Sequence, residues 1–453
     1  MNKKILYPYQ RKGVRKIDHF DGRALLADEM GLGKTLQSLA WTFWRQQFPL
    51  VVICPAGLRV NWQREILKFF GEHADICEGR DAPQGKVQFA SRILIISYEI
   101  LEHWLPYFHS MWPVTVIIDE CHRVKNPSAK CTKATKQICD LADNVIALSG
   151  TPFTNRPAEL WTVLNIVRPD VWPTFLPYAM DHCQPRRTRW GWQYKGAVRL
   201  PMLNSKLNQF CMIRRRKKDV LKDLPDKTRT IIPIRLKDRR EYDAAEKDFL
   251  SWLGAQSKVK AKKAKSAQKL VMMGYLKRLA AKLKMPFANE WIKDALTESD
   301  EKLVVYGWHT DILEPLHQRH KKESVLISGK VTGNKRQDAV DRFQEEDDCR
   351  LLVGNIKAGG VGLNLTAAST GAFIELGMTP ADHLQVEDRL HRIGQTKKVH
   401  WYYLIAENTV EEDLCSMIQG KQEAFDAAID GKELGSLDIF DQLVHGMKRR
   451  LLV

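Results

Sequence analysis

Residues 28–35 read Asp-Glu-Met-Gly-Leu-Gly-Lys-Thr and directly follow the short apolar run 24–27. This pattern predicts a buried strand, a glycine-rich turn and a helix that opens at Lys34 and Thr35. Backbone N–H groups in such a turn converge on an anion, and the positive end of the helix dipole adds to the attraction. The lysine would reach the β- and γ-phosphates of a nucleotide, and the threonine hydroxyl would bind Mg²⁺.

The turn departs from the common phosphate-loop pattern at one position. Asp28 stands where the first glycine is expected, whereas Gly31 and Gly33 are present and allow the tight turn. All three are candidate nucleotide-binding residues. A strand–turn–helix corner without a ligand gives the same pattern, so the prediction needs a second half of the site.

Asp119 and Glu120 supply this second half. They follow the mainly β-branched run 114–118, which is typical of a strand buried on both faces in a parallel sheet. Ligands bind at the carboxyl ends of such strands, where Asp119 could hold Mg²⁺ through water and Glu120 could orient and deprotonate the attacking water. Adjacent carboxylates also occur at an ordinary strand exit or helix cap. Downstream of a phosphate loop, the nucleotide site is the favoured interpretation.

Three further stretches fit the same chemistry. Gln10 precedes the phosphate loop, and its amide offers the donor and acceptor that an adenine edge requires. Ser149 and Thr151, in Ser-Gly-Thr-Pro, follow the last strand of the first half and could couple the nucleotide site to the second half. Gly362, in Gly-Gly-Val-Gly-Leu-Asn-Leu, predicts a tight backbone turn that faces the nucleotide.

Arg389 and Arg392 lie three residues apart in the stretch 385–395, which we expect to place them on one helical face. One or both could act as arginine fingers on the charge that develops on the γ-phosphoryl group. An isolated Arg-x-x-Arg is usually a surface pair, but its order after the other motifs favours catalysis. Gln395, at the end of the stretch, is a candidate coupling residue.

Alternating strands and helices must position these residues. The predicted strands of the first half are 24–27, 50–54, 93–97, 114–118 and 145–149, and helical patterns such as 35–46 and 61–70 lie between them. The rhythm returns later with the predicted strands 302–306, 325–328, 350–353, 372–376 and 401–405. Strands that alternate with helices indicate parallel sheets with right-handed crossovers. The second half lacks Gly-Lys-Thr, so we expect one site in the cleft between two lobes.

The segment between these halves breaks the rhythm. It contains several tryptophans and prolines, the basic run 214–218 and a helical pattern with a lysine-rich stretch at 258–269. Those lysines could follow a phosphate backbone, or they could form a solvated helix face. We therefore predict an α/β protein with two RecA-like parallel-sheet lobes and a helical insertion between them. The predicted parts are a first lobe at 1–155, an insertion and connector at 156–285, a second lobe at 286–425 and a helical brace or tail at 426–453.

Composition limits the partners and the compartment. The chain of 453 residues has a formal net charge of +17, and a basic protein of this kind usually has a polyanionic partner. No apolar run has the length of a membrane span, and the N-terminus lacks the apolar core of a signal peptide. Nine cysteines without a C-x-x-C pair favour a reducing interior. Charge alone cannot separate DNA from RNA, or either from a membrane face.

Together these motifs resemble the Swi/Snf-like ATPases of helicase superfamily two, over roughly residues 5–420. The blocks 28–35 and 389–395 are highly specific to that family, in which an aspartate at the position of Asp28 is normal. The chain is most similar to the annealing-helicase subgroup, the HARP-type fork remodellers. Further stretches that look like this subgroup are 203–204, 212–220 and 224–227.

The resemblance implies an ATP- and Mg²⁺-dependent hydrolase that is stimulated by DNA and translocates on double-stranded DNA without full strand separation. Its substrates would be double-stranded or branched DNA, which it would remodel or re-anneal as a monomeric motor. We expect a minimal motor without the accessory repeats, nuclease or zinc module of the subgroup, as in a microbial or viral stand-alone protein. The tail could dock a protein partner. The resemblance also implies an intracellular protein located with DNA, in the cytoplasm or nucleoid of a microbial cell or of viral origin, or in the nucleus if eukaryotic.

The same resemblance implies contacts with the DNA backbone, which give sequence-independent and salt-sensitive binding. Each of these residues could instead be a cap or turn residue. The candidates are Pro55, Arg59, Ser97, Tyr98, Lys125, Asn126 and Thr366.

Three alternatives remain open at the level of the sequence. A strand-separating helicase would need a wedge or a stacking platform for single strands, and Trp190 and Trp192 have no assigned role. A nucleotide-gated DNA clamp would bind ATP with little turnover. A remodeller of protein–DNA complexes would use the same motor on a different target.

Overall fold

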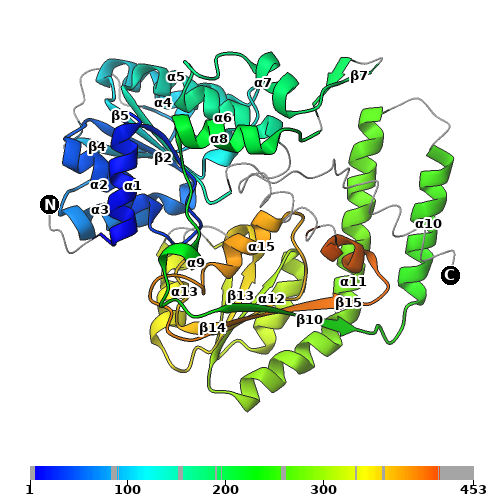
Figure 1. Ribbon diagram of the computed structural model, residues 1–453. Helices are drawn as coiled ribbons and strands as arrows, with labels where there is room; N and C mark the ends of the chain where they lie inside the picture. Colours follow the sequence, from blue (N-terminus) through cyan, green and yellow to red (C-terminus); the bar gives the residue numbers. More distant parts are fainter. Residues whose placement is uncertain are drawn as a thin grey trace. The chain divides into compact units, whose positions relative to one another are not determined.

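The computed structural model of the chain describes residues 6–82, 89, 91–151, 157–188, 191–194, 196–256, 262–331, 334–359, 363–416 and 418. These residues divide into two compact units, which meet in the sequence between Leu224 and Pro225. Figure 1 shows that each unit contains a sheet with helices packed against it. Over the described residues, no helix has the length and hydropathy that a membrane span requires.

The first unit is built on a seven-stranded sheet in the order β3-β4-β2-β5-β6-β1-β9, and its strand pairs are parallel. The strands β2, β4 and β6 are buried at every position, as their uninterrupted apolar sequences predict. The strands are β1 (Arg23–Leu26), β2 (Leu50–Cys54), β3 (Asp75–Ile76), β4 (Ile93–Ser97), β5 (Thr115–Asp119), β6 (Asn144–Leu148) and β9 (Met212–Ile213).

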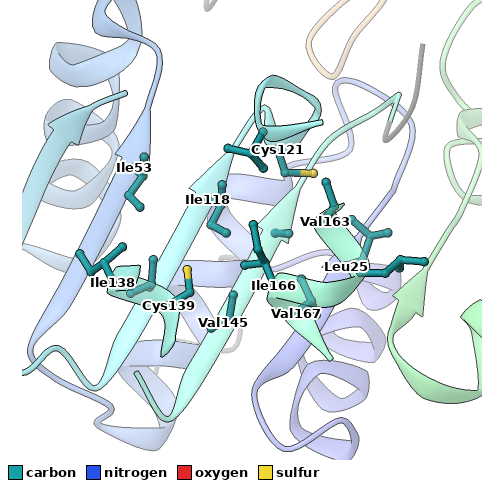
Figure 2. Close-up of a cluster of buried hydrophobic side chains, with 14 of the residues drawn as sticks. Leu25, Ile53, Ile118, Cys121, Ile138, Cys139, Val145, Val163, Ile166 and Val167 are labelled. Carbon is teal, nitrogen blue, oxygen red and sulfur yellow. The ribbon is translucent and has the colours of Figure 1, made fainter. Parts of the chain in front are cut away.

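Helices cover this sheet and complete its core. Figure 2 shows Leu25, Ile53, Ile118 and Val145 of four different strands beside side chains from two helices, and all of these residues belong to one buried cluster. The helices of the unit are α1 (Pro8–His19), α2 (Lys34–Arg45), α3 (Arg59–Phe70), α4 (Leu101–Met111), α5 (Lys130–Leu141), α6 (Leu160–Val167), α7 (Phe175–His182), α8 (Leu200–Phe210) and α9 (Lys217–Val220). A separate antiparallel ribbon consists of β7 (Arg186–Thr188) and β8 (Gly191–Gln193).

The second unit has a six-stranded sheet in the order β10-β15-β14-β11-β13-β12, again with parallel pairs. Its strands are β10 (Lys227–Ile234), β11 (Lys302–Gly307), β12 (Ser324–Ile327), β13 (Leu351–Asn355), β14 (Ala368–Phe373) and β15 (Val399–Ala406). Its helices are α10 (Arg240–Gln256), α11 (Lys262–Glu298), α12 (Thr310–Arg319), α13 (Asn334–Glu345), α14 (Ile356–Gly359) and α15 (Pro380–Glu387). The prediction of an α/β protein with two parallel-sheet lobes is confirmed.

The segment predicted as an insertion contributes a strand to each sheet. The strand β9 pairs with β1 of the first unit, and β10 pairs with β15 of the second. The sequence 227–234 reads Lys-Thr-Arg-Thr-Ile-Ile-Pro-Ile, whose basic residues and Pro233 hide its strand character. A proline is tolerated there because β10 is the edge strand of its sheet. The predicted strand 372–376 is displaced, because β14 already ends at Phe373. The predicted tail at 426–453 lies outside the described residues.

Candidate nucleotide and DNA site

The phosphate loop connects β1 with α2. Gly31 and Gly33 have φ angles of 81° and 70°, in the left-handed region that favours glycine. A Cβ atom on Gly33 would also collide with the Gln10 amide. The Lys34 Nζ atom, at the first position of α2, lies 2.9 Å from the Asp28 carbonyl oxygen. Burial lowers the pKa of Lys34, while the carboxylates of Glu120, Asp28 and Asp119 act in the opposite direction.

Asp28 is fully buried, and its side chain accepts hydrogen bonds that hold the start of the phosphate loop in place. Arg215 Nε donates a 2.9 Å hydrogen bond to its Oδ1 atom, and Gln37 Nε2 donates a 3.1 Å bond to Oδ2. Arg214, the residue before Arg215, donates hydrogen bonds to the carbonyl oxygens of Ala27 and Gly150. Both oxygens of Asp28 thus have partners within the chain, and these contacts support the shape of the loop.

Gln10 packs against the same loop and is almost completely buried. Its Nε2 atom lies 3.2 Å from the Leu32 carbonyl oxygen, which also accepts a bond from the Tyr9 hydroxyl. Its Oε1 atom accepts a 2.9 Å bond from the Tyr7 N–H at the start of α1. An amide carries two N–H groups and two lone pairs on its oxygen. These contacts therefore orient the side chain and leave further donor and acceptor capacity for hydrogen bonds to an adenine edge.

Asp119 ends β5, and three groups of the first unit hold it. Trp62 Nε1 of α3 donates a 2.8 Å hydrogen bond to Asp119 Oδ2, and the Glu120 N–H donates a 2.9 Å bond to Oδ1. The Tyr98 hydroxyl donates to the Asp119 carbonyl oxygen at 2.6 Å. Burial and the Glu120 charge raise the pKa of Asp119 to about 7, although Trp62 and Lys34 act against this rise. A carboxylate under this constraint favours a cation beside it.

Glu120 has a left-handed backbone with φ of 52°, a sparsely populated conformation for a residue with a side chain. Its Oε2 atom lies 3.3 Å from His122 Nδ1, which lies 3.3 Å from the Ser149 hydroxyl. The same hydroxyl accepts a bond from the Thr151 N–H. The structure therefore brings the predicted coupling residues into contact with the predicted catalytic carboxylate through a histidine.

Trp62 and His122 are functional candidates that the sequence analysis missed. Trp62 belongs to an amphipathic helix and has the pattern of an ordinary core residue. His122 lies two residues after Glu120, which was the available signal for it. The role of the basic run was also missed, because β9 before it is only two residues long.

Arg389 and Arg392 lie in the second unit, and the expectation that they share one helical face is wrong. The helix α15 ends at Glu387, and both arginines belong to the turns that follow. Their NH1 atoms nevertheless converge on the Leu363 carbonyl oxygen, at 3.5 and 3.2 Å. The Arg389 carbonyl oxygen accepts a bond from the Leu365 N–H. The two guanidinium groups are thus gathered by contact with this segment and not by helical periodicity.

Gln395 fixes the end of these turns. Its Nε2 atom donates to the carbonyl oxygens of Ala368 and Thr366, at 2.9 and 3.3 Å, and its Oε1 atom accepts a bond from the Lys397 N–H. This residue fastens the arginine segment to the start of β14. Gly362 lies outside the described residues.

Glu387, the last residue of α15, is fully buried and binds the edge strand β10. Its carboxylate lies 2.8 Å from Lys227 Nζ, accepts two 2.6 Å bonds from Arg229 and accepts a 2.7 Å bond from the Tyr403 hydroxyl. Burial raises the pKa of Glu387, but Lys227 and Arg229 outweigh it and hold the pKa well below its usual range. These contacts therefore attach the segment that carries Arg389 and Arg392 to β10, the first strand after the unit boundary.

Of the predicted DNA contacts, Ser97 and Tyr98 are each only 3% exposed. The Tyr98 hydroxyl donates its hydrogen bond to the Asp119 carbonyl oxygen. Pro55 is also buried, while Arg59 is partly exposed and bonds the Cys77 carbonyl oxygen at 3.1 Å.

The other predicted contacts lie nearer the surface. Asn126 is exposed and caps the turn through the Ser128 N–H, and Lys125 lies 3.5 Å from Glu159. Thr366 of the second unit is partly exposed, and its hydroxyl lies 3.5 Å from Gln344 Nε2.

Family models and known proteins both match most of this chain. Residues 9–285 match the SNF2-related domain, and residues 287–394 match the helicase conserved C-terminal domain. A Xenopus tropicalis protein, the SWI/SNF-related matrix-associated actin-dependent regulator of chromatin subfamily A-like protein 1, is 35% identical over 92% of this chain and 44% of its own length. The mouse DNA annealing helicase and endonuclease ZRANB3 is 31% identical over 94% of this chain and 41% of its own length.

The chain thus spans less than half the length of these two relatives. Among solved structures, the Sulfolobus solfataricus SWI2/SNF2 ATPase core in complex with dsDNA is 26% identical, with a TM-score of 0.44, over 94% of this chain and 93% of that one. The SNF2-related match by itself covers more than half of the chain. Together with the helicase C-terminal match, it shows that the chain belongs to the SNF2-related family of helicase-type ATPases.

Proposed function

We propose that the chain is an ATP- and Mg²⁺-dependent motor, stimulated by DNA, that translocates on double-stranded DNA and remodels or re-anneals branched DNA. One observation carries the proposal. The phosphate loop with Lys34 follows the carboxyl end of β1. Asp119 and Glu120 lie at the carboxyl end of β5, in the same parallel sheet. This is where open α/β sheets bind nucleotides.

The residues of the first unit fit the nucleotide and its metal. Backbone N–H groups of the loop and Lys34 would hold the phosphates, while Thr35 and Asp119 would hold Mg²⁺. The raised pKa of Asp119 supports this, because a cation would favour the charged carboxylate that burial disfavours. Bound Mg²⁺ would neutralise charge on the phosphates.

Glu120 would position and deprotonate the attacking water. Its strained backbone and its contact with His122 fix the carboxylate, so that little reorganisation is needed during hydrolysis. Arg389 and Arg392 of the second unit would stabilise the charge of the γ-phosphoryl group. The contacts from His122 through Ser149 give a route by which the state of the nucleotide alters the backbone after β6.

DNA would be bound mainly through its phosphates. Arg59, Lys125, Asn126 and Thr366 remain the proposed contacts, and the net charge of +17 supports a polyanionic partner. We propose a monomeric motor that works inside the cell, with the C-terminal tail as a possible dock for a protein partner. Forks are favoured over plain duplex as the substrate because a relative is named as a DNA annealing helicase.

Two assays test the proposal. Translocation on duplex DNA should displace a third strand bound in the major groove, and it should require ATP. Annealing activity should close a fork whose arms are held open by a single-strand binding protein. Displacement without annealing would restrict the function to a duplex translocase. Binding of ATP and DNA without either activity would replace the motor by a nucleotide-gated clamp.

A further inference from the structure

The antiparallel ribbon of β7 and β8 stands apart from the parallel sheet of the first unit. In Figure 1 it extends from the end of α7 away from that sheet. Its register pairs Arg186 with Gln193, Arg187 with Trp192 and Thr188 with Gly191. None of these residues takes part in the proposed ATP cycle.

The root of the ribbon is fixed to the body of the unit. The Gly196 N–H donates a 3.0 Å hydrogen bond to the Cys183 carbonyl oxygen, and the Val198 N–H donates to His182. The Tyr194 ring packs edge-on against Phe175 of α7, with the centroids 4.9 Å apart. These contacts hold both ends of the ribbon, so its exposed residues keep a defined position.

The outer part of the ribbon carries an exposed aromatic ring beside exposed cations. Trp192 is 51% exposed, which is unusual for so large an apolar side chain, and Arg186 and Arg187 are exposed as well. Arg187 and Trp192 are directly opposite in the register, so their side chains share one face of the ribbon. Neither arginine has an ion-pair partner in the part of the chain that the structure describes.

The surrounding sequence is also depleted of negative charge. Residues 182–213 contain six lysine and arginine residues and no aspartate or glutamate. Asp181 precedes this stretch and pairs with Arg199 at the root. Arg186 precedes Arg187 in the strand and therefore points to the opposite face of the ribbon. A ribbon with cations, an exposed aromatic ring and no carboxylates complements a polyanion with flat apolar groups, which describes a nucleic-acid strand with unpaired bases.

We infer that the ribbon of β7 and β8 binds the single-stranded part of branched DNA, with Trp192 stacked on an unpaired base, Arg187 on the adjacent phosphate and Arg186 on a phosphate that passes the opposite face of the ribbon. Bases inside a duplex are covered by their neighbours, so an exposed tryptophan stacks on the unpaired bases of separated strands. The inference rests on the proposed DNA substrate and adds to it an element that distinguishes forks from plain duplex.

The first test measures binding by fluorescence anisotropy, with a fork that has single-stranded arms and a blunt duplex of the same length. Trp192→Ala should weaken fork binding by about tenfold or more, the effect of losing one base–aromatic stack, and should change duplex binding little. Trp192→Phe should retain most of the fork affinity. Trp44→Ala, which removes another exposed tryptophan of this unit, is the matched control and should bind both DNAs normally.

A second variant tests the arginines. Arg186→Ala/Arg187→Ala should lower fork affinity and reduce the slope of log affinity against log salt by about 1 to 2, as expected for two lost phosphate contacts. Lys321→Ala/Lys322→Ala removes two exposed charges before β12 and controls for net charge. It should leave the preference for the fork intact.

These outcomes separate the inference from the proposed function. If Trp192→Ala binds the fork as the wild type does, or weakens fork and duplex equally, the inference is wrong, and a protein partner of the ribbon becomes the alternative. If wild-type ATP hydrolysis is not stimulated by DNA, the proposed motor fails, while the binding measurements still decide the role of the ribbon. Equal thermal unfolding of wild type and Trp192→Ala excludes misfolding as the cause of a loss.

Discussion

At the scale of single residues, the candidate site depends on groups that hold the catalytic side chains as well as on those side chains. A hydrogen bond from Trp62 of α3 orients Asp119, and His122 contacts both Glu120 and Ser149. Such supporting contacts fix the geometry and the pKa of a group that touches a metal or a reacting atom.

Trp62→Phe should raise the Mg²⁺ concentration needed for ATP hydrolysis. The change keeps an aromatic ring but removes the N–H that stabilises the charged form of Asp119, so the pKa of that carboxyl rises further. Hydrogen bonds to charged groups contribute about 1.5–3 kcal/mol, which predicts a shift of about tenfold or more. The measurement is a Mg²⁺ titration of hydrolysis at neutral and alkaline pH.

The sign of the pH effect follows from the same contact. Alkaline pH deprotonates Asp119 in both proteins, so the defect of Trp62→Phe should shrink as pH rises above about 7. Trp104→Phe is the matched control, because Trp104 is also buried in this unit and donates to the Gly79 carbonyl oxygen. A defect of the same size in both variants, at every pH, would indicate lost packing instead.

Glu120→Gln should bind ATP normally and hydrolyse it about 10²–10⁴-fold more slowly, since it cannot accept the proton of the attacking water. Single-turnover hydrolysis and nucleotide binding measure the two properties separately. Lys34→Ala is expected to lose nucleotide binding as well. Normal hydrolysis by Glu120→Gln would remove the water-activation role.

The sequence predicted Lys34, Asp119 and Glu120 because their chemistry is encoded by neighbours in the chain. Trp62 was not predicted, because its partner is 57 residues away and only the packing of α3 against β5 brings the two together. Asp28 was predicted as a ligand, whereas its ion pair with Arg215 could not be read from a separation of 187 residues.

At the scale of elements, ion pairs join the edge strand β10 to the C-terminal end of α15. Lys227 and Arg229 of β10 hold Glu387, and the turns with the two arginines begin directly after it. The first residues after the unit boundary therefore contact the helix end that precedes the proposed arginine fingers.

Glu387→Gln should destabilise the second unit by about 1.5–3 kcal/mol, because the buried carboxylate loses its charge-assisted bonds to Lys227 and to the half-exposed Arg229. It should also lower DNA-stimulated hydrolysis with little change in ATP affinity, since the arginine turns lose their anchor. The matched control is Glu411→Gln, which breaks the fully buried pair with Lys284 away from the arginines. Both variants should lose stability, the control at least as much as the test, and only the test should lose hydrolysis.

The depressed pKa of Glu387 fixes the direction of a pH effect on stability. The ion pair contributes fully above the pKa of the unfolded carboxyl, about 4.3, and its contribution is lost as pH falls below that value. Thermal unfolding of the wild type should therefore show a decline in acid that Glu387→Gln lacks. Parallel pH profiles for the two proteins would exclude this contribution.

Periodicity predicted the long apolar strands but not β10, whose alternating basic residues serve the ion pairs with Glu387. It also predicted a helical face for Arg389 and Arg392, although α15 ends before them. Short strands such as β9 and turns held by side-chain contacts carry no period, so only the folded structure reveals them.

At the scale of the whole molecule, the proposed motor would require groups from both units. The phosphate loop and the two carboxylates belong to the first, and the two arginines belong to the second. The proposal thus predicts that hydrolysis, unlike nucleotide binding, depends on both.

Arg392→Ala should leave ATP binding nearly unchanged and reduce DNA-stimulated hydrolysis by about 10³–10⁵-fold, the range reported for arginine fingers. Nucleotide binding by equilibrium titration and hydrolysis with saturating duplex provide the two readouts. Equal loss of binding and hydrolysis would indicate that Arg392 acts only through the turn it shares with Arg389.

The most direct test of the account is steady-state ATP hydrolysis without nucleic acid and with single-stranded DNA, blunt duplex or a fork, with Lys34→Ala as control. The account predicts strong stimulation by duplex, at least equal stimulation by the fork, and no hydrolysis by Lys34→Ala. Intact ATP binding without stimulation by any DNA would contradict the claim that this chain is a DNA-driven motor.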